Sequence, residues 1–187
     1  MKKSAIVLIS ILALSQPVFA DFKEHFDLGQ QYLSNYQYSG AVTEFKNALR
    51  INYLDNSARI GLINSYLARG AYYANNEKNW EKAADDYRSA LFYMQYYPTA
   101  EAARNSVQGI GPVQSNLSKC LSISKFATNP SSRFAKAKQL RAEGNFAAAA
   151  YEFNQSLGDK NYIKDSYTQV GDIMKLLGND PKAAEYY

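Results

Sequence analysis

The sequence has almost none of the residues that build catalytic or metal sites. Among its 187 residues there is one histidine, His25, and one cysteine, Cys120. A lone cysteine excludes an intramolecular disulfide, and we interpret Cys120 as a small buried hydrophobic residue. A single histidine without a neighbouring cysteine does not make a zinc site, and no nucleophile motif or glycine-rich phosphate loop accompanies it. We therefore expect a protein that is not an enzyme, with no catalytic residue, no metal and no cofactor.

Long hydrophobic runs are also missing, apart from one short run at the amino terminus. The positive pair Lys2–Lys3 precedes the apolar stretch Ala5–Leu14, and Val18–Ala20 resembles a signal-peptidase site. The apolar run is too short to span a bilayer, and no cysteine lies beside it for lipid attachment. Residues 1–20 are therefore predicted to be a cleavable signal peptide of bacterial type. We expect the mature chain to begin at Asp21, to have no transmembrane segment, and to be periplasmic or extracellular.

The charge balance of the mature chain does not favour a nucleic-acid partner. Removing Lys2–Lys3 from the 21 basic residues leaves 19 against 17 acidic residues, a net charge of about +2. The charge is uneven, however, because the segment Arg104–Ala142 contains seven basic residues and no acid. That segment is either a solvated helical surface or an electrostatic site for a carboxylate, a phosphate, an anionic lipid head group or an acidic peptide. The seven residues are Arg104, Lys119, Lys125, Arg133, Lys136, Lys138 and Arg141. The adjacent acids Asp85–Asp86 are expected to be solvated or paired with Lys82 and Arg88.

Apolar residues at helical spacing dominate the rest of the chain. In residues 22–50 the pattern occurs twice, on either side of the short polar segment Ser34–Gln37. Each run forms one apolar stripe, so this stretch is predicted to be two antiparallel helices that need further helices to bury them. The stripes consist of Phe26, Leu28, Tyr32 and Leu33, and of Ala41, Phe45, Ala48 and Leu49.

The same pattern of small and large residues recurs along the chain. The slot that Gly29 occupies recurs 34 residues later at Ile63, and the slot of Ala137 recurs 34 residues later at Gly171. An alanine followed four positions later by an aromatic residue occurs in four units, at Ala41/Phe45, Ala83/Tyr87, Ala149/Phe153 and Ala183/Tyr187. This pattern resembles the tetratricopeptide (TPR) repeat, a helix–turn–helix unit of 34 residues. The resemblance implies an all-α, right-handed superhelical solenoid of antiparallel helix pairs, with about four to five repeats.

Three units are expected to depart from the plain repeat. The units are predicted at residues 22–55, 56–98, 99–129, 130–163 and 164–187. In the second, an insertion at 71–79 adds either two turns of helix or a loop ending at Asn79 as a helix N-cap, and we expect its Tyr72–Tyr73 pair to pack on the adjacent helix. The third is degenerate, with a break at Gly109–Pro112 and a following loop at Lys125–Ser132. The last is truncated at Tyr187, so this uncapped end is expected to fray and to self-associate.

The resemblance also implies a function. Members of the family bind peptides or protein partners on a concave face lined by the first helix of each repeat. Matching positions give the candidate groove-binding residues Gln30, Asn64, Phe134, Lys138, Arg141, Asp172 and Lys175. Lys138, Arg141 and Lys175 are expected to converge on an acidic or C-terminal peptide, unless Asp172 neutralises them through Lys138.

We therefore expect an exported, non-enzymatic scaffold for protein–protein interaction in bacterial envelope assembly, secretion or surface function. The alternative is an N-terminal targeting or adaptor segment of a larger protein whose activity lies in a downstream domain.

Overall fold

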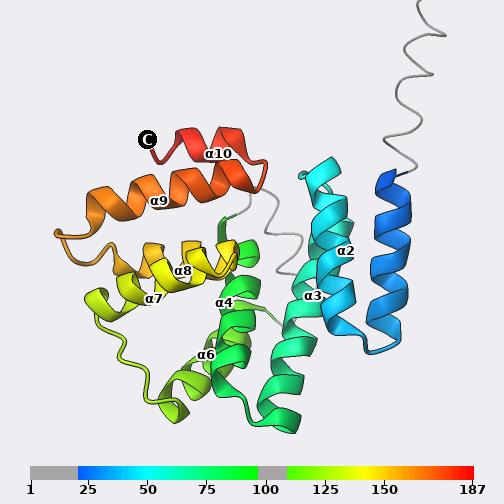
Figure 1. Cartoon of the computed structure of the whole chain (residues 1–187), viewed down its shortest axis with the longest axis horizontal. Helices are drawn as coiled ribbons and strands as arrows, with labels where there is room; N and C mark the ends of the chain where they lie inside the picture. Colours follow the sequence, from blue (N-terminus) through cyan, green and yellow to red (C-terminus); the bar gives the residue numbers. More distant parts are fainter. Residues whose placement is uncertain (1–20, 97–108) are drawn as a thin grey trace, which may run out of the picture.

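A computed structural model describes residues 21–96 and 109–187, which form helices and turns without any β-strand (Figure 1). The first helix covers residues 21–34. It is followed by α2 (Tyr38–Ile51), α3 (Asn56–Tyr72), the π-helix η1 (Tyr73–Glu77), α4 (Trp80–Tyr96), α6 (Ile110–Ile123), α7 (Pro130–Ala142), α8 (Phe146–Ser156), α9 (Ile163–Leu176) and α10 (Asp180–Ala184). The predicted signal peptide and the first helix of the third unit lie outside the described residues. No described helix is both long enough and apolar enough to cross a membrane.

Local sequence signals explain where the helices begin and end. The Asp55 carboxylate accepts a hydrogen bond of 2.7 Å from the backbone N–H of Ala58 and caps α3. Asn129 and Asn179 cap α7 and α10 in the same way, and a proline lies in the first positions of both helices, where its missing N–H costs no hydrogen bond. Gly144 follows the end of α7 with a φ of 78°, a backbone conformation that glycine adopts without strain. These signals produce short turns between antiparallel helices.

Close packing between the helices depends on large rings that face small residues. Phe45 of α2 is fully buried, and a Cβ atom added to Gly29 or Gly61 would lie 2.9 Å or 2.4 Å from its ring. Gly171 of α9 faces the ring of Tyr187 in the same way, at 2.9 Å. The alanines expected at these helix contacts are all buried, namely Ala41, Ala83, Ala149 and Ala183. The predicted all-α solenoid of successive helix pairs is confirmed, and it is compatible with the tetratricopeptide pattern.

The helix α4 lies at the centre of the arrangement. Helix α2 packs on α3, α3 on α4, α7 on α8, α8 on α9 and α9 on α10. In addition, α4 contacts both α6 and α8. The contact with α8 is a departure from a simple stack, because α8 belongs to the fourth predicted unit and α4 to the second. Figure 1 shows the result: the first helix, α2 and α3 form one half, α7 to α10 form the other, and α4 joins the two.

A buried ion-pair cluster holds α4 against α7 and α8. The Nε of Arg88 donates a hydrogen bond of 2.5 Å to Glu152, and at most 2% of either side chain is exposed. Arg133 of α7 donates to the other oxygen of Glu152 at 2.9 Å. Asp85 pairs with Arg88 at 2.8 Å and with Lys136 at 3.8 Å. A buried charge must be paired to remain charged, so this cluster requires α4 to lie against α7 and α8.

Two expectations about charge need correction. Asp85 pairs with Arg88 as expected, but Asp86 is buried and pairs with Arg69 of α3, because α3 packs directly against this face of α4. The basic segment is not simply a solvated surface, since three of its cations pair with acids on neighbouring helices. Those three are Arg133, Lys136 and Arg141.

The insertion at 71–79 lengthens a helix instead of forming a loop. Helix α3 continues to Tyr72, η1 adds another turn, and the chain reverses at Lys78, which has a φ of 55°. The Asn79 side chain accepts a hydrogen bond of 3.1 Å from the N–H of Lys82, the N-cap that the sequence predicts. Tyr73 packs against the core, whereas 43% of Tyr72 is exposed, so the expected packing holds fully for only one ring of the pair.

Helix α6 begins earlier than the sequence suggests. A break is predicted over Gly109–Pro112, yet α6 starts at Ile110, because Pro112 stands in the first turn, where no N–H donor is needed. Gly109 supplies the preceding bend with a φ of 78°. Cys120 of this helix is buried as expected, and burial raises the pKa of its thiol, which keeps it protonated and unreactive.

Candidate functional site

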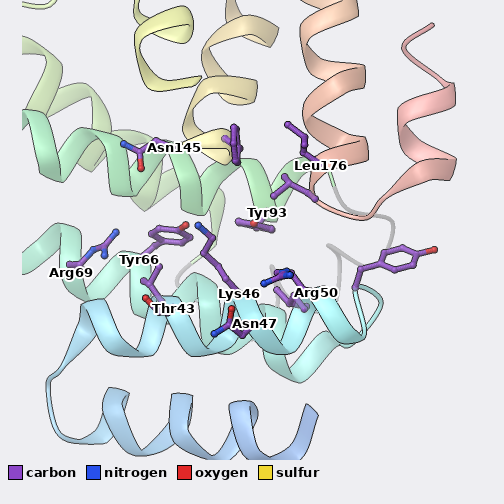
Figure 2. Close-up of a pocket in the computed structure, with 14 residues that line it drawn as sticks. Thr43, Lys46, Asn47, Arg50, Tyr66, Arg69, Tyr93, Asn145 and Leu176 are labelled. Carbon is purple, nitrogen blue, oxygen red and sulfur yellow. The ribbon is translucent and has the colours of Figure 1, made fainter. Parts of the chain in front are cut away.

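A cleft of about 550 Å³ lies between the two halves of the molecule, and we call it the central cleft. Its walls come from α2, α3 and α4 on one side and from the α7–α8 turn and the end of α9 on the other (Figure 2). The lining residues are Val42, Thr43, Lys46, Asn47, Leu49, Arg50, Tyr53, Tyr66, Arg69, Tyr93, Asn145, Phe146, Leu176 and Leu177. The volume is typical of sites that hold a small ligand or a few side chains of a partner.

The polar wall of the central cleft is one face of α2. Thr43, Lys46, Asn47 and Arg50 follow one another at helical spacing and line the cleft together. The opposite face of α2 buries its apolar stripe, including Phe45, against the first helix and α3. Burial of that stripe therefore turns the polar face towards the other half of the molecule.

Arg69 of α3 is fixed at the edge of the central cleft by two hydrogen bonds. Its Nε and Nη2 donate to the two carboxylate oxygens of Asp86 at 2.9 Å and 2.7 Å. Its guanidinium also lies over the ring of Tyr66, 5.6 Å from the centroid. Burial raises the pKa of Asp86, an effect that Arg69 opposes. Burial likewise raises the pKa of Tyr66, so its hydroxyl stays protonated and is a hydrogen-bond donor in this wall.

Lys46 is a partly buried cation of this wall. No described residue forms an ion pair or a hydrogen bond with its ammonium group. Burial lowers the pKa of Lys46, and the positive charge of Arg69 lowers it further. Arg50, one turn along α2, is exposed. No aspartate or glutamate is among the lining residues, so the central cleft attracts anions.

The facing wall is largely apolar. Phe146, Leu176 and Leu177 line it, and 59% of Leu176 is exposed. Asn145 adds one polar side chain at the α7–α8 turn, which Figure 2 places opposite Lys46 and Tyr66. The central cleft thus offers cations and hydrogen-bond donors on one side and hydrocarbon on the other, an arrangement suited to an amphipathic anion.

Only three of the seven candidate groove residues predicted from the sequence line a second hollow, which is separate from the central cleft. Phe134, Lys138 and Arg141 line a space of about 550 Å³ together with Asp165 and Gln169. The Lys138 ammonium lies 6.0 Å from the centroid of the Phe134 ring.

Asp172 pairs with Arg141 at 3.5 Å, and not with Lys138. It also accepts a hydrogen bond of 2.9 Å from the hydroxyl of Tyr187. Because two carboxylates lie in or beside the second hollow, its potential is less positive than that of the central cleft.

The remaining candidates lie apart from both hollows. Gln30 is exposed on the first helix, Asn64 is half-buried on α3, and Lys175 is exposed near the end of α9. None of the three lines either hollow.

The sequence did not predict the residues of the central cleft. The repeat resemblance places the binding face on the first helix of each unit, whereas α2 is the second helix of its unit. A signal was nevertheless present. Lys46 and Arg50 stand four apart on the polar face of α2, and the one acid of that helix, Glu44, faces away and contacts His25 at 2.7 Å. Within residues 21–96 and 109–187, no three His, Cys, Asp or Glu side chains come together as metal ligands.

Comparison with known proteins does not identify the function of this chain. No protein-family model and no curated protein sequence matches the chain. Among solved structures, the crystal structure of MamA protein is similar over 89% of this chain and 87% of that chain, with 12% sequence identity and a TM-score of 0.30. A likeness at this level carries no argument about a shared site, so the function must be argued from the residues of this chain.

Proposed function

We propose that the protein is an exported, non-enzymatic scaffold that binds a partner protein, and that a segment of the partner docks in the central cleft. The observation that carries this proposal is the cleft itself, in which Lys46 and Arg50, neither paired with an acid of the described residues, face an exposed apolar wall. A helical solenoid holds such a surface on rigid elements, and its cleft is large enough for a few side chains but too small for a folded domain.

The setting proposed for this binding is the bacterial envelope or the cell surface. Support comes from the amino-terminal sequence, where the short apolar run Ala5–Leu14 follows Lys2–Lys3 and a signal-peptidase-like site ends at Ala20. Fractionation of the source cells and mass measurement of the protein test this part of the proposal. A mature chain that begins at Asp21 is expected outside the cytoplasm, and an uncleaved chain within the cytoplasm contradicts it.

Site-specific photo-crosslinking tests the proposed role of the cleft. A photoreactive amino acid is placed at Asn47, inside the central cleft, and in a matched control at Gln155, an exposed position on α8 outside it. In cells that express the protein from its own gene, we expect a discrete protein adduct from position 47 that position 155 does not give. If the two positions give the same adducts, or position 47 gives none, the partner does not dock in the central cleft.

A further inference from the structure

The charges of the central cleft restrict the chemistry of its occupant. Lys46 and Arg50 project from neighbouring turns of α2, and Arg69 approaches from α3. The Nε and Nη2 groups of Arg69 already donate to the Asp86 carboxylate, so Arg69 adds positive electrostatic potential to the cleft and does not itself hold the bound group. Two donors therefore remain for a bound group, the ammonium of Lys46 and the guanidinium of Arg50. A carboxylate has two oxygens and can accept from both of these donors.

The apolar wall restricts the occupant further. Leu176, Leu177 and Phe146 face the cations across the cleft, and Leu176 leaves more than half of its side chain uncovered. A sugar acid or an inorganic anion would satisfy the cations and leave this wall in contact with water. A chain segment with an apolar side chain next to an acid covers both walls, and burying the apolar surface adds a favourable free energy.

The polar uncharged residues fit the backbone of such a segment. Asn47 and Asn145 lie on opposite sides of the central cleft, and each amide both donates and accepts hydrogen bonds. The protonated hydroxyl of Tyr66 adds a donor on the α3 side. Peptide groups need both kinds of partner when they leave water.

We infer that the central cleft recognises an acidic segment of the partner chain, with a side-chain carboxylate held by Lys46 and Arg50 and an adjacent apolar side chain packed on Leu176 and Leu177. This inference rests on the proposed scaffold function and specifies the chemistry of its partner. The site differs from the groove expected from the repeat resemblance, because it is built on α2, the second helix of its unit.

Peptide binding to the purified protein tests the inference directly. The probe is an array of short synthetic peptides that combine glutamate and leucine in every order, beside a matched array in which each glutamate is glutamine. We expect glutamate peptides to bind about tenfold or more tightly than their glutamine counterparts, the difference that one charge-assisted contact provides. The preference should weaken as salt is added, because screening acts on charged ligands. Equal binding of the two arrays, or no binding to either, overturns the inference.

Variants of the protein locate the effect within the cleft. Lys46→Gln and Arg50→Gln should each weaken the best glutamate peptide about tenfold and leave the glutamine peptides unchanged. Matched controls are Lys119→Gln and Lys160→Gln, which remove exposed charges outside the central cleft and should change nothing. If the controls weaken binding as much as the cleft variants, the attraction comes from the net charge of the protein and the site assignment is wrong.

Proton uptake gives a second readout of the same contact. Because burial and Arg69 lower the pKa of Lys46, a bound carboxylate should raise it again, so that binding at alkaline pH takes up protons. Calorimetry in two buffers of different ionisation enthalpy measures this uptake, which Lys46→Gln should remove. Binding of a glutamate peptide without such uptake places the carboxylate away from Lys46 and contradicts the assignment.

The outcomes separate this inference from the proposed function. If position 47 crosslinks a protein partner while glutamate and glutamine peptides bind equally, the scaffold role stands and the acidic partner is wrong. If glutamate peptides bind selectively but no protein is crosslinked, the chemistry of the cleft stands and the scaffold role fails. A uronic-acid oligosaccharide that displaces the best peptide at a lower concentration than the peptide itself overturns the choice of a protein segment.

Discussion

Replacing Gly61 with alanine tests the packing that holds α3 against α2. An added Cβ would lie 2.4 Å, 2.5 Å and 2.8 Å from three ring atoms of Phe45, whereas carbon atoms in contact are normally about 3.5–4.0 Å apart. Neighbouring helices also confine the ring on other sides. On one side a Cβ at Gly29 would already lie 2.9 Å from it, and Phe26 meets it edge-on with centroids 5.9 Å apart.

Two opposing effects set the expected magnitude. Alanine is favoured over glycine by about 1 kcal/mol in the interior of a helix, and overpacking of a tight core costs about 1–3 kcal/mol. The observed overlap is severe and the ring is confined, so we expect the cost to exceed the gain. Gly61→Ala should therefore lower the free energy of unfolding by about 1–2 kcal/mol.

The control is the same change at Gly111, which lies in α6 with no atom within 4 Å of its added Cβ. Gly111→Ala should leave stability unchanged or raise it by up to about 1 kcal/mol. A Phe45→Leu change should relieve the clash, so the double variant Phe45→Leu, Gly61→Ala should be more stable than the two separate effects predict. Urea denaturation followed by far-ultraviolet circular dichroism measures the wild type and the four variants. If Gly61→Ala is as stable as Gly111→Ala, the close approach described here does not exist in solution.

Three further predictions concern other parts of the chain. Glu152→Gln should cost about 3 kcal/mol of unfolding free energy, because it removes the buried negative charge that pairs with both Arg88 and Arg133 and leaves Arg88 with Asp85 alone, and a loss below 1 kcal/mol in denaturation would show that the cluster is not buried. Burial and the charge of Arg69 lower the pKa of Lys46, so the folded state binds this proton less tightly than the unfolded chain and stability rises with pH up to about 10.5. Lys46→Met should accordingly be more stable than the wild type at neutral pH, with a difference that disappears above pH 10.5. A variant that is less stable than the wild type at neutral pH would contradict a lowered pKa of Lys46. Amide exchange should be fast across Pro181–Tyr187 and slow across Ala41–Leu49, whereas strong protection of both in a monomer would exclude a frayed end.

The repeat positions could be predicted from the sequence because packing constraints there are local. A ring such as Phe45 must face a glycine or an alanine at fixed spacing, and that requirement leaves a pattern in residue sizes that recurs at Tyr87 and Phe153. The N-cap at Asn79 was predictable for the same reason, since its hydrogen bond reaches only three residues along the chain.

The contact between α4 and α8 and the central cleft left no comparable pattern. Arg88 and Glu152 are ordinary polar residues when each is considered on its own helix, and only the fold brings them together. The same is true of Lys46 and Leu176, which lie on helices of different halves. The spacing of residues predicts the contacts within a unit, but contacts between distant units depend on the path of the chain between them, which no local spacing records.

The contact of α4 with α8 has a consequence for how the protein folds. In a stack where each unit touches only its neighbours, order can spread from any unit to the next. Here Arg88 and Glu152, which lie 64 positions apart, must meet before the buried cluster that they share with Asp85 and Arg133 is complete. Bringing the ends of so long a segment together costs chain entropy before the contact forms, and this cost slows folding. The contact also joins distant helices, so they are expected to fold in one transition. The chain is therefore expected to fold more slowly, and more nearly all at once, than a linear array of the same number of helices.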